Sequence, residues 1–138
     1  MATVRYDGFD KLTQEVQRDI KALGQRMTDA VIAGSEVMIE ALRKEAAESF
    51  KNPTGELSES IDVAPPGVQR DTTLTYAEVY PQGYHSTTGY KAYRNAAIGY
   101  ILNYGVEGRI DPNDWDDRAD RAARKDIRTA MEKELFGK

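Results

Sequence analysis

Apolar and polar positions follow a helical period over the first third of the chain. Apolar or small residues recur at steps of three or four, while charged side chains occupy many of the positions between them. This spacing places one apolar stripe along one side of an α-helix over residues 9–50. The stripe consists of Phe9, Leu12, Val16, Ile20, Leu23, Met27, Val31, Gly34, Met38, Leu42 and Ala46.

Such a helix is long for a chain of 138 residues. At about 1.5 Å per residue it would extend roughly 60 Å, whereas a compact domain of this length has a radius of gyration near ~14 Å. The helix therefore either breaks near Gly24 or Gly34 or projects from the body of the protein to meet neighbours. We expect projection, or a bent pair of segments.

The helix is expected to end in residues 52–55, Asn-Pro-Thr-Gly. Pro53 cannot continue a helix, and Gly55 tolerates a left-handed turn. Residues 57–63, LSESIDV, then alternate between apolar and polar side chains and predict a half-buried strand. Glu59 interrupts the apolar side of this strand, which indicates an edge position.

Three segments of different character follow. Residues 64–71, APPGVQRD, predict a loop. Residues 72–80, TTLTYAEVY, are rich in β-branched and aromatic side chains and predict a second strand. Residues 81–91, PQGYHSTTGYK, are polar and interrupted by glycine, and they predict a long loop.

Two further helices are expected after this loop. Residues 91–104 carry apolar side chains at helical spacing, and Gly105 is a favourable C-terminal stop. Farther on, Asp111 is expected to cap the last helix, with Pro112 at its first position. Apolar residues recur every four positions in this helix, at Trp115, Ala119, Ala123, Ile127, Met131 and Leu135.

These elements predict an α+β fold, in which a long N-terminal helix packs on a small antiparallel β-sheet with two further helices. Residues 1–138 are expected to form a single domain, with residues 1–51 as the long helical segment and residues 52–138 as the sheet and two helices. Hydrophobic residues make up 40% of the chain and charged residues 30%. This balance is typical of a globular domain.

Composition argues against several classes of protein. The chain contains no cysteine, which excludes a disulfide framework and a thiolate zinc site. Its longest largely apolar run, residues 96–102, is far below the ~20 residues that span a bilayer, and residues 1–10 lack the apolar core of a signal peptide. The net charge of −4 also lacks the basic surplus of most nucleic-acid-binding proteins. We therefore expect a cytosolic protein without tight nucleic-acid binding.

A cluster of acidic residues precedes and opens the last helix. It does not match a calcium-binding EF-hand loop, because Trp115 occupies the fifth position and Asp116 stands where the loop requires glycine. The helix dipole favours acidic side chains in a first turn, so we interpret the cluster as structural rather than as a metal site. It comprises Asp111, Asp114, Asp116, Asp117 and Asp120.

Candidate catalytic residues are few. His85 is the only histidine, and the neighbouring Ser86 lacks the context of an activated nucleophile. Residues 88–91, TGYK, lack the spacing of a phosphate-binding loop. We therefore predict no enzymatic activity, with no catalytic, cofactor-binding or metal-binding residue and no cofactor.

Tyrosine is frequent, with eight in the chain, most of them between Tyr76 and Tyr104. Interleaved with Lys91 and Arg94, these rings could stack on nucleobases. A ring with a polar tip is also suited to a half-wet core or to a protein–protein contact. We favour the second interpretation because the chain as a whole is acidic.

Three motifs in this order resemble a family of small tailed-bacteriophage proteins, the minor tail component or tail-completion (head–tail joining) family. Residues 52–61, NPTGELSESI, resemble the family's junction between long helix and sheet, and residues 96–108, AAIGYILNYGVEG, resemble a helix ending in Tyr-Gly. Residues 111–127, DPNDWDDRADRAARKDI, occupy the place of the family's aromatic-anchored last helix. The chain departs from the family at Asn103, where many members carry glutamate, and at residues 109–112, where many have an Arg-Pro-Phe type of sequence.

The resemblance implies a structural role at the phage head–tail junction, as a ring-forming subunit that completes the tail or neck, without catalysis or cofactor. The implied partners are other neck, tail and connector proteins and further copies of this chain, with no membrane. DNA would pass only as cargo, and a net negative channel lining would keep phosphate from adhering. The protein would lie in the host cytoplasm during assembly and then in the virion.

A second class of function stays open. A cytosolic bacterial adaptor or regulatory protein could use the same long amphipathic helix to bind a partner. Gene neighbourhood distinguishes the two, because portal, capsid and tail-tube genes beside this one would favour the phage protein. An enzyme is a third and weaker alternative, since no base and nucleophile or metal set can be assembled from the sequence.

Overall fold

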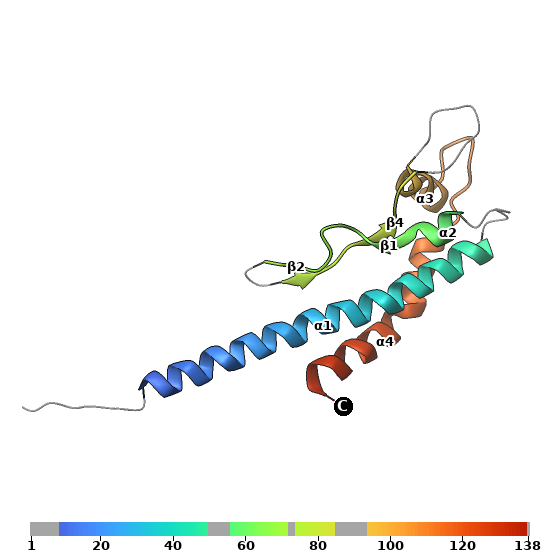
Figure 1. Ribbon diagram of the computed structural model, residues 1–138. Helices are drawn as coiled ribbons and strands as arrows, with labels where there is room; N and C mark the ends of the chain where they lie inside the picture. The colour runs from blue at the N-terminus through green and yellow to red at the C-terminus, as the bar shows by residue number, and fades with distance from the viewer. Residues whose placement is uncertain (1–8, 50–55, 72–73, 85–93, 138) are drawn as a thin grey trace, which may run out of the picture.

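The computed structural model describes residues 9–49, 56–71, 74–84 and 94–137. The expected α+β architecture is confirmed: a long N-terminal helix, small antiparallel β-ladders and further helices (Figure 1). In chain order the elements are α1 (Phe9–Ser49), α2 (Glu56–Ser60), β1 (Ile61–Val63), β2 (Gln69–Arg70), β3 (Thr75–Tyr76), β4 (Val79–Pro81), α3 (Asn95–Tyr104) and α4 (Trp115–Phe136).

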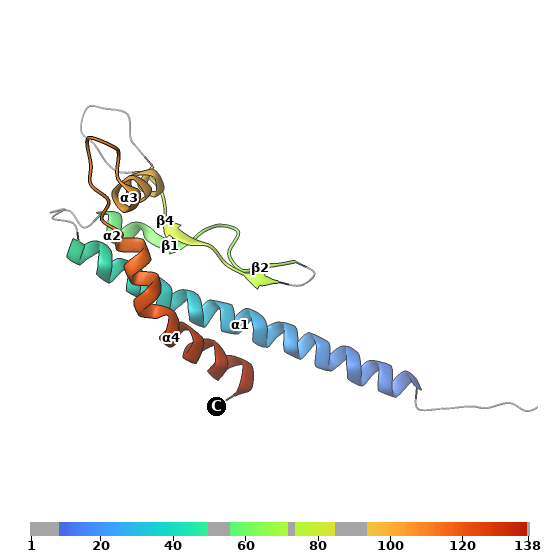
Figure 2. The ribbon, with the colours of Figure 1, turned by 180° about the vertical axis from the view of Figure 1, so that it is seen from behind.

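The helix α1 is a single continuous helix of 41 residues. Its C-terminal half lies against α4, α2 and the sheet, whereas its N-terminal half projects beyond them (Figures 1 and 2). The helix does not break at Gly24 or at Gly34. Of the alternatives predicted from its length, projection is therefore the one observed.

The two glycines mark places where other elements approach α1 closely. A Cβ atom at Gly34 would lie 3.0 Å from Met131 Cγ and 3.3 Å from Ile127 Cγ2, both on α4. A Cβ atom at Gly24 would lie 2.8 Å from Arg70 Nη1, on β2. The absence of a side chain thus allows α4 and β2 to approach, and this explains why residues of low helix propensity occur within α1.

The strands form one long hairpin built from two short antiparallel ladders. β1 pairs with β4, with Ile61 opposite Pro81, and β2 pairs with β3, with Gln69 opposite Tyr76. Arg43 of α1 attaches the first ladder, because its Nε and Nη2 donate to the carbonyl oxygen of Ile61 at 3.1 and 2.8 Å. The second ladder extends along α1 toward its projecting half (Figure 1).

The predicted strand over residues 57–63 is wrong in its first part. Residues Glu56–Ser60 form α2, and only Ile61–Val63 pair as a strand. Leu57 and Ile61 are both buried. Because they are four residues apart, their spacing fits one turn of helix as well as it fits alternation along a strand. Glu59 is exposed on α2 and is not a sign of a strand edge.

The next two segments also differ from expectation. The predicted loop over residues 64–71 contains β2, and the predicted strand over residues 72–80 is divided into β3 and β4. Between the two ladders, the N–H of Ala64 donates to the carbonyl oxygen of Glu78 at 2.8 Å. Glu78 lies between β3 and β4, so this bond links the two strands of the hairpin where the regular pairing stops. Residues 72–73 lie outside the described part of the chain.

The prediction of two later helices is confirmed, although their first residues differ from those expected. α3 ends where expected, at Gly105, which adopts φ 75° and donates its N–H to the carbonyl oxygen of Ile101 at 2.7 Å. The predicted cap at Asp111 is wrong, because α4 begins at Trp115 with Asp114 as the residue before it. The N–H of Asn113 donates to the carbonyl oxygen of Leu102 at 3.0 Å, and this bond to α3 delays the start of α4.

The core lies where the C-terminal half of α1 meets α4, β1 and α3. Trp115 is 2% exposed, and its Nε1 donates to the carbonyl oxygen of Gly99 at 3.0 Å. The indole thereby joins α3 and α4 while filling the space between them, as expected of an anchoring aromatic residue. The buried cluster comprises Leu42, Ala46, Ile61, Trp115 and Ala119.

Among the described residues, none of the helices combines the length and the apolar character needed to cross a bilayer. The helix predicted over residues 91–104 begins later than expected, at Asn95, because Arg94 is extended and pairs with Tyr84 in a β-bridge. Several predicted features lie outside the described residues: the helix stop at residues 52–55, and His85, Ser86 and Lys91.

Replacing Gly34 with leucine is expected to lower the free energy of unfolding by about 1–3 kcal/mol, because the new side chain needs space that Met131 and Ile127 occupy. Gly24→Ala is the matched control. It should be neutral or raise the free energy of unfolding by up to about 1 kcal/mol, since alanine favours helix and only the flexible end of Arg70 must move. Urea unfolding followed by circular dichroism measures both, and a Gly34→Leu variant as stable as wild type would contradict this packing.

Candidate interaction surface and the polar junction that supports it

The projecting half of α1 carries an uncovered row of large apolar side chains. At 100° per residue these side chains fall within an arc of about 80°, so they share one face of the helix. We call them the exposed stripe. Its members are Leu12, Val16, Ile20 and Leu23, with 47%, 48%, 64% and 54% of their surfaces exposed.

The exposed stripe continues directly into the core face of α1. Farther along the same side of the helix, Ala30 and Leu42 are almost fully buried, and Gly34 lies against α4. α4 ends at Phe136, which is itself exposed. One face of α1 is therefore core in its C-terminal half and bare in its N-terminal half, and apolar surface of this kind commonly marks an interface.

A second apolar surface lies at the other end of the molecule, on and near α3 (Figure 1). The rings of Tyr100 and Tyr104 are more than half exposed and contact each other, with centroids 4.6 Å apart. Tyr80 and Tyr84 are also exposed, whereas Tyr76 is half-buried. Most of the described tyrosines are thus on the surface, where a ring with a polar tip is suited to a protein contact.

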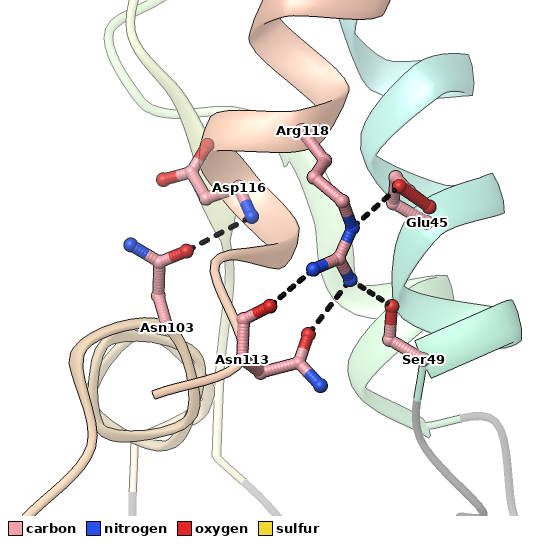
Figure 3. A network of polar contacts seen from close by, with 6 residues as sticks. All are labelled: Glu45, Ser49, Asn103, Asn113, Asp116 and Arg118. Atoms are coloured by element: carbon pink, nitrogen blue, oxygen red, sulfur yellow. Dashed lines mark hydrogen bonds and ion pairs between the residues drawn. The ribbon is translucent and has the colours of Figure 1, made fainter. Parts of the chain in front are cut away.

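A polar junction around Arg118 fixes the start of α4 to the end of α1 (Figure 3). Arg118 Nε donates to Glu45 Oε1 at 3.0 Å, and its Nη2 donates to Ser49 Oγ at 2.7 Å, both on α1. Its Nη1 donates to the carbonyl oxygen of Asn113, and its Nη2 to Asn113 Oδ1 at 2.9 Å. One guanidinium group therefore holds two helices and the segment before α4 together.

Two buried asparagines tie α3 to its neighbours. Asn103, 1% exposed, accepts at its Oδ1 a hydrogen bond from the backbone N–H of Asp116 at 3.0 Å (Figure 3). This satisfies one of the free N–H groups of the first turn of α4. Asn95, 3% exposed, donates from Nδ2 to the carbonyl oxygen of Gln82 at 2.8 Å, which joins α3 to the chain after β4.

A cavity of about 170 Å³ lies between α3, β4 and the start of α4. Its walls include the aromatic residues Tyr80, Tyr100 and Trp115 and the polar residues Asn103 and Asp116. The Nδ2 of Asn103 is buried without a hydrogen-bond partner among the described residues. Burial raises the pKa of Asp116 above its usual value, and the neighbouring carboxylates of Asp117 and Asp120 raise it further. The cavity thus has the size and the polar groups to hold ordered water.

The acidic residues predicted to cluster at the start of the last helix do not point toward one common site. Asp116 and Asp117 lie in the first turn of α4, and Asp114 adopts a left-handed conformation just before it. Asp120 accepts a hydrogen bond from Arg124 Nη2 at 2.7 Å. Over the described ranges, no three acidic or histidine side chains are grouped as a metal ion requires. Asp116 and Asp117 thus lie where the helix dipole favours acidic side chains.

Sequence reasoning missed the residues of the polar junction. Arg118 lies in a stretch crowded with charges, and nothing local distinguishes it from Arg121 or Arg124. Asn103 did carry a usable signal, because it is one of two asparagines in the otherwise largely apolar α3, and an amide needs a specific partner when buried. The exposed stripe, in contrast, was predicted as an apolar face.

Comparison with known proteins identifies no relative: no family model, no curated protein and no solved structure matches this chain.

Replacing Arg118 with alanine is expected to lower the free energy of unfolding by about 1–3 kcal/mol, because it removes several hydrogen bonds and leaves Glu45 without its partner. Arg124→Ala in the same helix is the matched control. It removes only an exposed i,i+4 pair with Asp120 and should cost less than about 0.5 kcal/mol. Urea unfolding measures both, and equal effects of the two changes would contradict a special role for Arg118.

Replacing Asp116 with asparagine is expected to stabilise the protein more at about pH 7 than at about pH 3. The raised pKa means that the folded state binds this proton more tightly than the unfolded state does. The stability that Asp116 contributes is therefore lost as the pH rises from the unfolded pKa through the folded pKa, and the uncharged amide does not suffer this loss. Asp126→Asn, at an exposed carboxylate of α4, is the control. A gain from Asp116→Asn that is equal at both pH values would contradict the explanation.

Proposed function

We propose that this protein is a structural subunit of the head–tail junction of a tailed bacteriophage, which completes the tail or neck as part of a ring and acts without catalysis. The observation that carries the proposal is the exposed stripe on the projecting half of α1. Leu12, Ile20 and Leu23 stand about half exposed on a helix that extends beyond its own body. A face of this kind is suited to being covered by another protein chain.

We call the projecting N-terminal half of α1 the arm, and the C-terminal half of α1 with the other described elements the body. This division favours assembly over catalysis. The body, built around Trp115 and Arg118, holds the C-terminal half of α1. The arm carries an apolar face and extends away from the cavity beside α3. In a ring, such an arm can reach an adjacent subunit while the body keeps its own core.

The local roles of the resembled motifs are compatible with this proposal. Residues 96–108 contain α3 and its stop at Gly105, and Trp115 is buried at the start of α4 as an aromatic anchor would be. Asn103, at the position where many members of the resembled family carry glutamate, uses its Oδ1 as an acceptor for the first turn of α4. A glutamate oxygen could accept the same kind of hydrogen bond.

The proposed partners are other neck, tail and connector proteins together with further copies of this chain. DNA would pass only as cargo, which agrees with a net charge of −4. The proposed location is the host cytoplasm during assembly and then the virion.

A cytosolic bacterial adaptor is the second candidate, and the same exposed stripe supports it. An amphipathic helix can place an apolar face in the groove of a partner, with anchors at helical spacing such as those of Leu12, Val16 and Ile20. The two candidates differ in the partner that covers the stripe, and gene neighbourhood is the first means of separating them.

The decisive experiment is genetic. Deleting the gene from the phage or prophage that encodes it should leave filled heads and tails unjoined in electron micrographs, and wild-type protein supplied in trans should restore infectious particles. Leu23→Asp should fail to restore them, because it places a charge in the exposed stripe. Leu74→Asp is the matched control, since Leu74 is 56% exposed, close to the 54% of Leu23, but lies outside the stripe.

Normal joined particles after the deletion would overturn the phage proposal. So would a locus without portal, capsid or tail genes around this gene. Restoration by Leu23→Asp as complete as by Leu74→Asp would show that the exposed stripe does not carry the function.

A further inference from the structure

We propose that the free protein forms an antiparallel dimer in which the projecting halves of two α1 helices pair along the exposed stripe. The occupant of the stripe is thus a second copy of this chain, and each copy presents the same residues to the other. The inference goes beyond the proposed function and does not depend on it, because it concerns the isolated protein.

The first argument is the period of the stripe. Leu12 and Leu23 are separated by eleven residues, and Gly34 follows after eleven more, where α4 packs. An 11-residue repeat corresponds to about 3.67 residues per turn, close to that of a straight α-helix. A stripe with this period stays in line over many turns, so it is suited to a long, nearly straight partner helix. The projecting half of α1 in a second copy of the chain is such a helix.

The second argument is coverage. α4 has 22 residues and α1 has 41, so α4 covers only about half of α1. α4 stays in contact with α1 as far as Met131, which lies against Gly34 close to the end of α4. An antiparallel second α1 would cover the remaining half. Its first turn would then arrive near the end of α4, where Phe136 is 69% exposed.

The third argument is charge. At 100° per residue, Glu15, Asp19 and Arg26 lie along one edge of the stripe, whereas the other edge carries the uncharged Thr13 and Gln17. In an antiparallel pair related by a two-fold axis, the same edges of the two helices face each other. With the axis between Ile20 and Lys21, Glu15 of each copy lies opposite Arg26 of the other, while the two Asp19 carboxylates lie three residues apart across the axis and repel each other. The two-fold axis produces this favourable pair twice.

The alternative orientation lacks this complementarity. In a parallel pair the charged edge of one helix faces the uncharged edge of the other, so no such ion pair forms. The hairpin also covers the uncharged edge near Gly24 and Thr28, to which Arg70 donates hydrogen bonds, although Thr13 and Gln17 are exposed. The edge with Glu15 and Arg26 is exposed. The structure therefore favours approach from the charged edge.

The dimer should be weak. Two helix faces of this length fall near the lower end of specific interfaces, which bury about 1,200 Å² or more, and we expect a dissociation constant in the micromolar range. The contact relies on a few half-exposed apolar side chains, with the two ion pairs setting orientation and register more than affinity.

The test is a charge exchange followed by sedimentation velocity from about 1 to about 100 μM protein. Glu15→Lys places lysine opposite Arg26 in its own homodimer, and Arg26→Glu places two carboxylates opposite each other. Each single variant should dimerise about threefold to tenfold more weakly than wild type, because like charges replace two exposed ion pairs. An equal mixture of the two variants should dimerise as wild type does, because both facing pairs are then of opposite sign.

Two further proteins complete the design. The double variant Glu15→Lys/Arg26→Glu should dimerise as wild type does, and Ile20→Asp should be monomeric throughout the range. All substituted positions are exposed, so circular dichroism and thermal unfolding should show an intact fold for every variant.

Several results would overturn the inference. These are a monomeric wild type at all concentrations, single variants that dimerise as wild type does, or a mixture that stays monomeric. Head-to-tail binding of the stripe to the tyrosine surface on α3 would also overturn it, and would appear as a Tyr100→Asp variant that is monomeric while both charge variants still dimerise. A failure here leaves the phage proposal to its own genetic test, which measures infectious particles rather than dimers.

Discussion

A helix of 41 residues in a chain of 138 presents more apolar face than the other described elements cover. The longest of these elements, α4, has 22 residues and runs beside only the C-terminal half of α1. This mismatch of lengths divides the protein into a packed body and a bare arm. The buried tryptophan, the short sheet and α3 all gather at the end of α1 where coverage is available.

The contacts within the body therefore also determine the orientation of the arm relative to the rest of the protein. Arg118 joins α4 to two residues in the last turns of α1, and Asn103 joins α3 to the first turn of α4. These contacts lie at one end of a helix roughly 60 Å long. A small change in how α4 sits on α1 would move the far end of the arm by a much larger distance. Specific hydrogen bonds at the junction thus limit the direction in which the exposed stripe points.

The fold was predictable where local patterns decide it. The continuous stripe of α1, the four-residue repeat from Trp115 and the stop at Gly105 all depend on residues close in sequence. The failures occurred where tertiary contacts decide. Residues 57–60 have a spacing that fits two structures, and the start of α4 is set by the bond from Asn113 to Leu102, a partner in another helix.

The candidate surface was half predictable for the same reason. The spacing of apolar residues predicts the apolar face of α1. Which half of this face α4 covers depends on the tertiary position of α4, which the spacing does not give. The polar junction was not predictable, because Arg118 meets residues about seventy positions earlier in the chain. The two glycines of α1 were considered as possible break points beside the favoured projection, since the sequence shows low helix propensity but not the neighbours that need the space.

The position of the hairpin has a geometric consequence for any larger assembly. Arg70 lies over Gly24 and Thr28, on one flank of the arm only. Near these two residues a partner chain can approach α1 only from the flank that the hairpin leaves open, whereas residues 10–23 are exposed all round the helix. Any assembly built on this helix must therefore leave room for the hairpin at the point where Arg70 lies against a glycine.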